Sequence, residues 1–315
     1  MPIGKNIFLA GHKGMVGQGF YRNLSKSGDH NIITIDRDNL DLRKESHVEN
    51  FFKKNKFDTV IIAAAKVGGI YANEKFPAMF IYDNLKIQTN LVHFSKKYEV
   101  GKVIFLSSCC IYPKNCKQPM NEDYILSGKL EPTNESYAIA KIAGISLCKS
   151  YYQQYGLNSF CPMPINLYGP YDNFDPLNSH IIAGLINRIH NAKIKNEETC
   201  TVWGSGKVKR EFMHVDDCVK GILYVNELIN DGSIINIAPG KELTTFETAE
   251  NISEIIGYKG NLILDKSKPD GTPRKFADSS KIKNLGWIGP KVDFKKGLHD
   301  MYKWYLDNKF LEMKV

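Results

Sequence analysis

The sequence predicts an α/β fold in which a doubly wound parallel sheet is joined by a second, smaller α/β domain. Three observations in the 315-residue chain support this class: apolar runs alternate with helical spacing, a glycine-rich turn follows the first run, and Gly and Pro interrupt the second half. The composition, 43% hydrophobic and 24% charged, is that of a globular protein. It excludes disordered, collagen-like and coiled-coil chains.

The first half of the chain has the order strand, helix, strand. Residues 5–10 (KNIFLA) form an apolar run that ends at Gly11, and residues 14–27 then have helical spacing. Further strands are predicted at 31–35, 58–65 and 102–106, with helices over 48–54 and 87–98 between them. Because these runs lack alternation, they suit parallel strands that are buried on both faces.

The second half, past about residue 168, predicts a smaller lobe that interleaves with the first. Gly169-Pro170, Gly204, Gly206 and Pro239-Gly240 interrupt helical patterns there. We expect a dinucleotide-binding domain of residues 1–167 plus about 213–240, and a substrate domain of about 168–212 plus 241–315. The site is expected at the carboxyl ends of the parallel strands.

A glycine turn predicts that a dinucleotide binds after the first strand. Gly11, Gly14 and Gly17 give the spacing G-x-x-G-x-x-G at the start of the first helix, which suits a Rossmann-type sheet. Glycine allows a tight turn, and the free N–H groups of a helix amino terminus bind a pyrophosphate. The residues expected to contact the coenzyme are Gly11, Lys13, Gly14, Met15, Val16, Gly17, Asp36, Arg37, Ala64, Tyr137 and Lys141.

The end of the second strand carries opposing signals about the coenzyme. Asp36 would accept a hydrogen bond from a ribose 2′-hydroxyl and so favours NAD(H), whereas Arg37 and Lys13 would pair with the 2′-phosphate of NADP(H). The residues therefore leave both coenzymes open.

Tyr137 and Lys141 stand four residues apart, on one face of a predicted helix. A nearby cation lowers the pKa of a phenol, so such a tyrosine can exchange a proton with a carbonyl oxygen while a nicotinamide transfers hydride. One hydroxyl of the pair Ser107-Ser108, after the fourth apolar run, would donate a hydrogen bond to the same oxygen. The pattern predicts an oxidoreductase, because a dinucleotide-sensing regulatory protein would not need this set.

Charge and cysteine content limit the other classes of partner. The net charge of +8 is spread along the chain without a run of like charges, so we expect no nucleic-acid partner. Seven cysteines without a C-x-x-C pair predict thiols in a reducing cytoplasm. No stretch has the length of a signal or a membrane span, and no metal site is predicted.

The Gly-turn, Ser and YxxxK series resembles the extended short-chain dehydrogenase/reductases, and longer strings resemble their GDP-L-fucose synthase family. These strings include AGHKGMVG, AAAKVGGI, SCCIYPK, LEPTNESYAIAKIAG, NLYGP, VWGSG and REFMHVDD. The resemblance covers nearly the whole chain. It implies a Rossmann domain with a smaller substrate domain, NADPH, a GDP-linked 4-keto-6-deoxy sugar as substrate, 3,5-epimerase and 4-reductase activities, and a homodimer.

The same resemblance implies the roles of particular residues. Ser108, Tyr137 and Lys141 match the reductive residues, and Cys110 and His180 match the acid/base pair of the epimerase. The nucleotide contacts match Asn166, Arg188, Trp203 and Arg210. From the residues alone, Cys110 and Trp203 also suit core positions, and His180 a loop.

Several departures from the family pattern lie where we expect the sugar to bind. They are Ser107, Cys109, Ile165, Tyr171, Asp175 and Leu177. They leave open a second hypothesis, a C4-reductase of another GDP-4-keto sugar such as a heptose, with Cys110 and His180 idle. A sugar 4,6-dehydratase is disfavoured, since cysteines stand where that chemistry needs a carboxylate.

Overall fold

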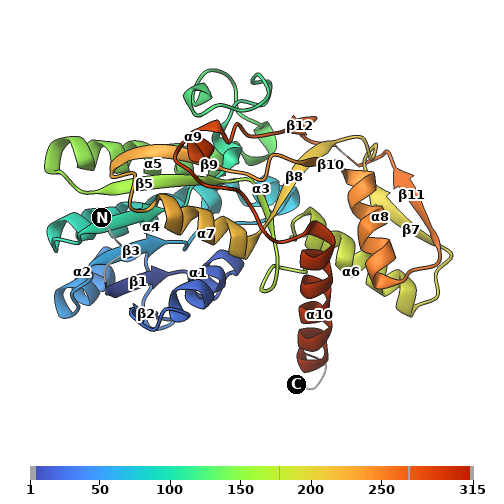
Figure 1. Cartoon of the computed structure of the whole chain (residues 1–315), viewed down its shortest axis with the longest axis horizontal. Coiled ribbons are helices and arrows are strands. Elements are labelled where there is room, and N and C mark those ends of the chain that lie inside the picture. Colours follow the sequence, from blue (N-terminus) through green and yellow to red (C-terminus); the bar gives the residue numbers. More distant parts are fainter. Residues whose placement is uncertain (1–4, 177, 269, 313–315) are drawn as a thin grey trace.

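The large domain is built on a parallel sheet. The computed structural model describes residues 5–176, 178–268 and 270–312. Six strands of this part pair in the order β2-β1-β3-β4-β5-β9 (Figure 1). Their bounds are β1 (Asn6–Ala10), β2 (Asn31–Ile33), β3 (Thr59–Ile62), β4 (Lys102–Phe105), β5 (Ser159–Pro164) and β9 (Asp231–Ile237). All the pairings are parallel, which confirms the predicted fold class.

Helices cover both faces of this sheet. On one face, α1 (Met15–Ser25) packs against α7 (Val215–Val225). On the other, α2 (Glu45–Lys54), α4 (Pro77–Lys97) and α5 (Glu135–Tyr155) lie in a row, and α3 (Ile70–Lys75) precedes α4. The strand order reverses at β1, where β2 lies on one side and β3 on the other. Such a switch point opens a crevice for ligands at the carboxyl ends of the strands.

A second apolar cluster forms the core of a smaller lobe. It joins α6 (Ile181–Ile194), α8 (Thr245–Ile256) and α10 (Phe294–Glu312) to the strand pair of β7 (Thr199–Trp203) and β11 (Asn261–Asp265). A further sheet of β6 (Asn166–Tyr168), β8 (Lys209–His214), β10 (Glu242–Thr244) and β12 (Arg274–Lys275) lies between the two cores (Figure 1).

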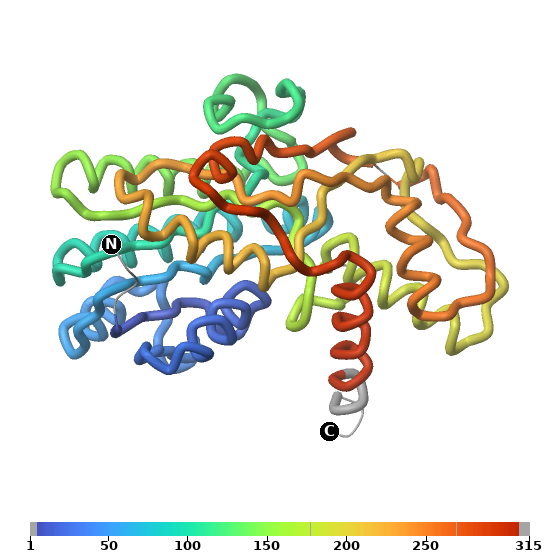
Figure 2. The backbone as a smooth tube through the Cα atoms, in the orientation of Figure 1, coloured from blue at the N-terminus to red at the C-terminus, as the bar shows by residue number. Residues whose placement is uncertain are grey.

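The chain crosses between the two cores more than once. After β12 it returns over the large sheet, where Ala277, Ile282 of α9 (Ser280–Asn284) and Trp287 join the first apolar cluster. It then leaves again to form α10, as the red part of the tube shows (Figure 2). The buried carboxylate of Glu211, on β8, accepts hydrogen bonds from Gly240 N and Ala277 N and so joins three of these segments.

Several elements differ in length from the sequence prediction. The helix predicted over 87–98 begins ten residues earlier, at Pro77, because proline suits the first helical turn and buried polar residues such as Asp83 and Asn84 obscure the apolar spacing. The second strand ends at Ile33 and the third at Ile62, since strand pairing stops before the apolar runs do. Within the described residues, no helix has the length and hydropathy of a membrane span.

Candidate active site

The glycine turn after β1 has the geometry that its spacing predicts. Gly11 has φ +90°, and a Cβ there would lie 2.5 Å from Ala64 N, so this position needs glycine. A Cβ on Gly17 would lie 2.1 Å from Gly11 O, which brings α1 close to the turn. Gly14 precedes α1 without a side-chain cap, and Met15 and Val16 form the first turn of the helix. The uncapped N–H groups fit a pyrophosphate.

Asp36 lies beside the glycine turn and is paired with it. Its carboxylate is 2.9 Å from Lys13 Nζ and 3.3 Å from His12 Nε2, and the hydrogen bond from Lys13 lowers the pKa of Asp36. Arg37 is exposed next to this pair. The negative charge of Asp36 is therefore balanced, and Arg37 is the cation that remains to meet a 2′-phosphate.

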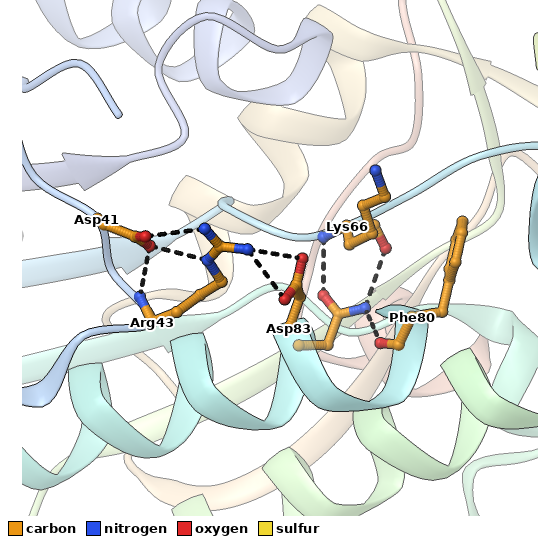
Figure 3. A network of polar contacts seen from close by, with 6 residues as sticks. Asp41, Arg43, Lys66, Phe80 and Asp83 are labelled. Atoms are coloured by element: carbon orange, nitrogen blue, oxygen red, sulfur yellow. Dashed lines mark hydrogen bonds and ion pairs between the residues drawn. The ribbon is translucent and has the colours of Figure 1, made fainter. Parts of the chain in front are cut away.

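A polar network holds the segment after β3 against α4 (Figure 3). Arg43 donates to both oxygens of Asp41 and of Asp83, at 2.8–3.3 Å. The next residue of the helix, Asn84, accepts from Lys66 N at 2.8 Å and donates to Lys66 O at 3.0 Å. These contacts hold Lys66 against α4, and those of Arg43 hold the segment after β2 against the same helix, before any ligand binds.

Ser108 lies just past the end of β4. Its Oγ accepts from Cys110 N at 3.2 Å and so caps the 3-10 turn η1 (Cys109–Ile111). This turn directs Ser108 and Cys110 away from the sheet, at the carboxyl edge where ligands bind.

Helix α5 carries Tyr137 and Lys141 to the same edge. A Cβ on Gly144 would lie 2.3 Å from the Phe105 ring, so glycine lets this helix pack closely on β4. The buried Lys141 Nζ donates to Leu106 O at 2.7 Å and lies 5.8 Å from the centre of the Tyr137 ring. The half-buried Tyr137 is within hydrogen-bonding reach of Ser108. The structure thus brings the predicted reductive residues together.

The pKa values of this pair differ from the sequence expectation. Burial raises the pKa of Tyr137, with a smaller contribution from Cys110, and the hydrogen bond from Ser108 opposes it. Burial lowers the pKa of Lys141 to about 8. The expected lowering of the Tyr137 pKa is wrong for the free protein, because burial of the phenol raises its pKa by more than the hydrogen bond from Ser108 lowers it.

Cys110 is surrounded by groups that favour its thiolate. Although burial opposes ionisation, Lys275, a hydrogen bond from Ser108 and the nearby His180 together lower the pKa of Cys110. Lys275 Nζ, on β12, lies 3.7 Å from the sulfur. A thiolate formed there is a base within reach of neutral pH.

His180 immediately precedes α6. Its Nδ1 lies 3.8 Å from Oδ1 of Asp172, and this partner raises the pKa of His180 against the opposing effect of burial. Cys110 contributes to the same shift, so the thiol and the imidazole face one site. The two groups have opposite tendencies, one towards the anion and the other towards the cation.

Of the four residues predicted to bind the nucleotide, Arg188 and Trp203 contact each other, while Arg210 and Asn166 lie on β8 and β6. Arg188, on α6, lies over the exposed indole of Trp203, 4.1 Å from the ring centre, and donates to Thr201 O. Arg210 lies nearer Cys110, and burial lowers its pKa to about 10. Asn166 donates to Glu211 O at 2.9 Å, which ties β6 to β8. Trp203 is therefore not a core residue.

Half of the departures from the family pattern lie in the core. Ser107, Cys109 and Ile165 are buried, and Cys109 donates to Met163 O. The expectation that these positions lie against the sugar is wrong for Cys109 and Ile165, because both side chains belong to the apolar core of the large domain. Tyr171 packs on Trp304, and Leu177 lies outside the described residues.

Lys275 and Asp172 are members of the site that sequence reasoning missed. Lys275 is 165 residues from Cys110 along the chain, and only the pairing of β12 with β8 brings it near. Asp172 is eight residues before His180, across a loop whose course no periodicity predicts. A carboxylate close in sequence to a candidate histidine was the one available signal.

The parallel sheet, the glycine turn and the Ser, Tyr and Lys set define a dinucleotide-dependent enzyme of the short-chain dehydrogenase/reductase class. Residues 7–238 match the model of the NAD dependent epimerase/dehydratase family. The chain belongs to this family.

Particular relatives lie within the same family. The chain is 46% identical to GDP-L-fucose synthase of Escherichia coli over 314 residues, covering 97% of this chain and 98% of that one. Among solved structures, it resembles a GDP-6-OMe-4-keto-L-xylo-heptose reductase from Campylobacter jejuni, with a TM-score of 0.92, 34% identity, and coverage of 98% and 99%. A GDP-mannoheptose C4 reductase from the same organism, with NADP bound, has a TM-score of 0.88 and 35% identity, with coverage of 97% and 99%.

Proposed function

We propose that this protein is an NADPH-dependent 4-ketoreductase with 3,5-epimerase activity on a GDP-4-keto-6-deoxy sugar. The 46% identity to a GDP-L-fucose synthase over nearly the full length supports the enzyme class, the coenzyme and the GDP-sugar substrate. The observation that carries the epimerase step is Cys110, which lies among Ser108, His180 and Lys275.

The epimerase step needs two proton-transfer groups. A ketone makes the protons on the adjacent carbons acidic, so a base can remove one and leave an enolate. Cys110 as thiolate takes the proton, while the Ser108 hydroxyl and the Tyr137 phenol donate to the C4 oxygen. His180 as imidazolium returns a proton to the opposite face of the carbon, which inverts it.

The reductive step uses the same oxygen. Bound NADPH supplies the hydride that C4 accepts. Tyr137 gives its phenolic proton to the C4 oxygen, Ser108 orients that oxygen, and the ammonium of Lys141 stabilises the phenolate that forms. The glycine turn and Arg37 fit the phosphates of this coenzyme.

We assign the two lobes different tasks. The domain of residues 1–167 and about 213–240 holds the coenzyme, while the smaller lobe, about 168–212 and 241–315, holds the nucleotide of the substrate. Trp203 offers an indole face to the guanine, and Arg188 and Arg210 offer charge to the diphosphate. Residues near 277–287 are an exception to this division, because they pack in the core of the large domain.

One experiment tests both steps at once. The enzyme is incubated with GDP-4-keto-6-deoxymannose and NADPH in deuterated water, and deuterium at C3 and C5 and the product stereochemistry are read by NMR. Tyr137→Phe is expected to keep part of the exchange, because Ser108 still donates to the C4 oxygen, but to reduce 10²- to 10⁴-fold more slowly, since the proton donor of the reductive step is lost. Cys110→Ser is expected to lose exchange, because a hydroxyl has almost no anion near neutral pH, yet to reduce a pre-epimerised ketone.

A C4-reductase of a GDP-heptose is the second candidate. The similarity to a heptose reductase over 98% of this chain favours it. It predicts reduction of a GDP-4-keto-heptose without deuterium at C3 or C5. That result with wild-type enzyme would overturn the epimerase assignment and leave the reductase in place.

The surroundings of the enzyme are also proposed. All seven cysteines are free thiols, which suits the reducing cytoplasm. Exposed apolar side chains on the outer faces of α4 and α5, among them Met79, Tyr82, Ile139 and Tyr152, suit an interface between two copies of the chain. We therefore expect a cytoplasmic homodimer.

A further inference from the structure

Asp172 and His180 form a pair in which the carboxylate is buried and the imidazole is exposed. The His180 side chain is 51% exposed, whereas the Asp172 side chain, whose carboxylate faces Nδ1 of His180, is only 5% exposed. Because Nδ1 is turned to the protein, Nε2 is the ring nitrogen left to face a substrate. The 3.8 Å contact is an ion pair longer than a hydrogen bond, as contacts in a free active site often are.

The carboxylate of Asp172 is not satisfied by the loop alone. Oδ1 accepts from Asn173 N at 2.8 Å, but Oδ2 is buried without a hydrogen-bond partner in the part of the chain that the structure describes. A buried carboxylate in this state is costly unless a cation lies close. His180 in its protonated form is the cation that the fold places there.

The loop around Asp172 is anchored on both sides. Tyr171 has φ +69°, and its ring lies 4.9 Å from Trp304 and 5.7 Å from the Arg22 guanidinium. Near His180, Asn178 O accepts from Gly69 N at 3.1 Å. The backbone strain at Tyr171 and these contacts keep Asp172 beneath the imidazole and prevent it from turning to solvent.

We propose that Asp172 is a positioning residue that holds His180 with Nδ1 towards the protein and Nε2 towards the substrate, as a protonated proton donor. This inference deepens the proposed function and rests on its epimerase step. It separates the roles of the two proton-transfer groups: Cys110 removes a proton and the Asp172–His180 pair returns one.

The charged groups around the His180 imidazole favour its protonated form. Asp172 and, more weakly, Cys110 raise the pKa of His180, while burial lowers it. Lys275 Nζ lies 3.7 Å from the Cys110 sulfur, and its charge lowers the pKa of that thiol. A histidine without such partners, with a pKa of ~6.5, is mostly neutral at pH 7 and a poor proton donor.

The test compares Asp172→Asn, which keeps the shape of the side chain and removes its charge, with wild-type protein. The His180 ring is titrated by ¹⁵N-edited NMR in the full chain, assigned with His180→Asn. The midpoint is expected to fall towards ~6.5, and deuterium entry at C3 and C5 to slow about 10- to 100-fold. Reduction of a pre-epimerised ketone is expected to continue, which shows that the variant is folded.

Three further variants distinguish positioning from loop damage. Asp172→Glu keeps the charge and is expected to recover part of the exchange rate. Asp175→Asn removes a negative charge from the same loop but keeps an oxygen that can accept the two hydrogen bonds from Asn178, and it is expected to leave the His180 midpoint in place. Adding Asp172→Asn to His180→Asn is expected to cause no further loss of exchange, because Asp172 acts through the ring.

The outcomes separate the two hypotheses. A His180 midpoint that Asp172→Asn leaves unchanged would overturn the inference, as would an additive loss in the double variant. Absence of deuterium from the wild-type product would instead overturn the proposed epimerase step, while the NMR titration still decides whether Asp172 sets the protonation of His180.

Discussion

At the scale of single residues, burial is the main influence on the chemistry of the site. It raises the pKa of Tyr137, lowers that of Lys141 to about 8, and opposes ionisation of Cys110. Only Cys110 has enough neighbouring positive charge to reverse the effect. The pKa values of the thiol, the phenol and the ammonium therefore shift in different directions, although the three groups lie in one site, because each has different neighbours.

The pKa of Lys141 predicts how reduction depends on pH. Reduction needs Tyr137 protonated and Lys141 charged, so the rate is expected to be highest below pH 8 and to fall as Lys141 loses its proton above it. The measurement is kcat/KM for reduction of a pre-epimerised ketone from pH 6 to 10. Lys141→Met should have a low kcat/KM over the whole pH range and should not show the fall above pH 8. A rate that stays constant from pH 7 to 9.5 would contradict the assignment.

Arg37 predicts the coenzyme preference. Because Lys13 and His12 already balance Asp36, Arg37 is expected to supply most of the attraction for the 2′-phosphate. Arg37→Ala should lower kcat/KM with NADPH about 10- to 100-fold and leave that with NADH nearly unchanged, since a charge-assisted contact contributes ~1.5–3 kcal/mol. Steady-state rates with both coenzymes test this, and equal losses with the two would refute it.

At the scale of elements, close packing of α5 on β4 sets the position of the reductive residues. Gly144 permits this contact, while Gln88 Nε2 donates to Ala140 O at 2.6 Å and holds α5 to α4. Two successive turns of one helix thus carry Tyr137 and Lys141 to the end of the strand that precedes Ser108. A shift in the position of α5 would therefore displace Tyr137 and Lys141 together relative to Ser108.

Gly144→Ala is expected to destabilise the protein although alanine favours helices. The new methyl group would meet the Phe105 ring at 2.3 Å, and overpacking of ~1–3 kcal/mol exceeds the helix gain of ~1 kcal/mol. Urea denaturation and the rate of reduction should both report the change. Gly28→Ala, at an exposed turn with φ +69°, gives a comparison in which backbone strain acts without overpacking, because the Cβ there meets no atom within 4 Å. A more stable Gly144 variant would show that α5 has room to move.

Sequence pattern predicted some elements better than others, for physical reasons. β1, β3 and β4 were predicted because burial on both faces makes them continuously apolar, and the glycine turn because close backbone approach permits only glycine at positions such as Gly17. β5 and β9 of the same sheet were not predicted. The start of α4 was missed because buried polar residues interrupt its spacing. Lys275 was missed because its contact with Cys110 depends on strand pairing in the second half.

At the scale of the whole molecule, the outer faces of α4 and α5 predict the homodimer. Tyr82 is 61% exposed on α4, so Tyr82→Glu is expected to place a charge in the interface and shift the protein towards monomer by at least about tenfold in Kd. Sedimentation velocity at micromolar concentration measures the shift. Tyr21→Glu, on α1 at the opposite face of the sheet, is the matched control and should remain dimeric. Identical behaviour of both variants would place the interface elsewhere.

The repeated crossing of the chain between the two cores has a consequence for how the molecule comes apart. Ala277, Ile282 and Trp287 pack on the large sheet although α10 beyond them packs in the smaller lobe. Glu211 on β8 also accepts hydrogen bonds from Gly240 N and Ala277 N, so it joins three separate segments of the chain. Neither lobe is a continuous stretch of sequence that a protease could release intact. Heat or denaturant should therefore melt both in one cooperative transition, and a chain that ended before β12 would leave both cores incomplete, as well as Cys110 without its ammonium neighbour.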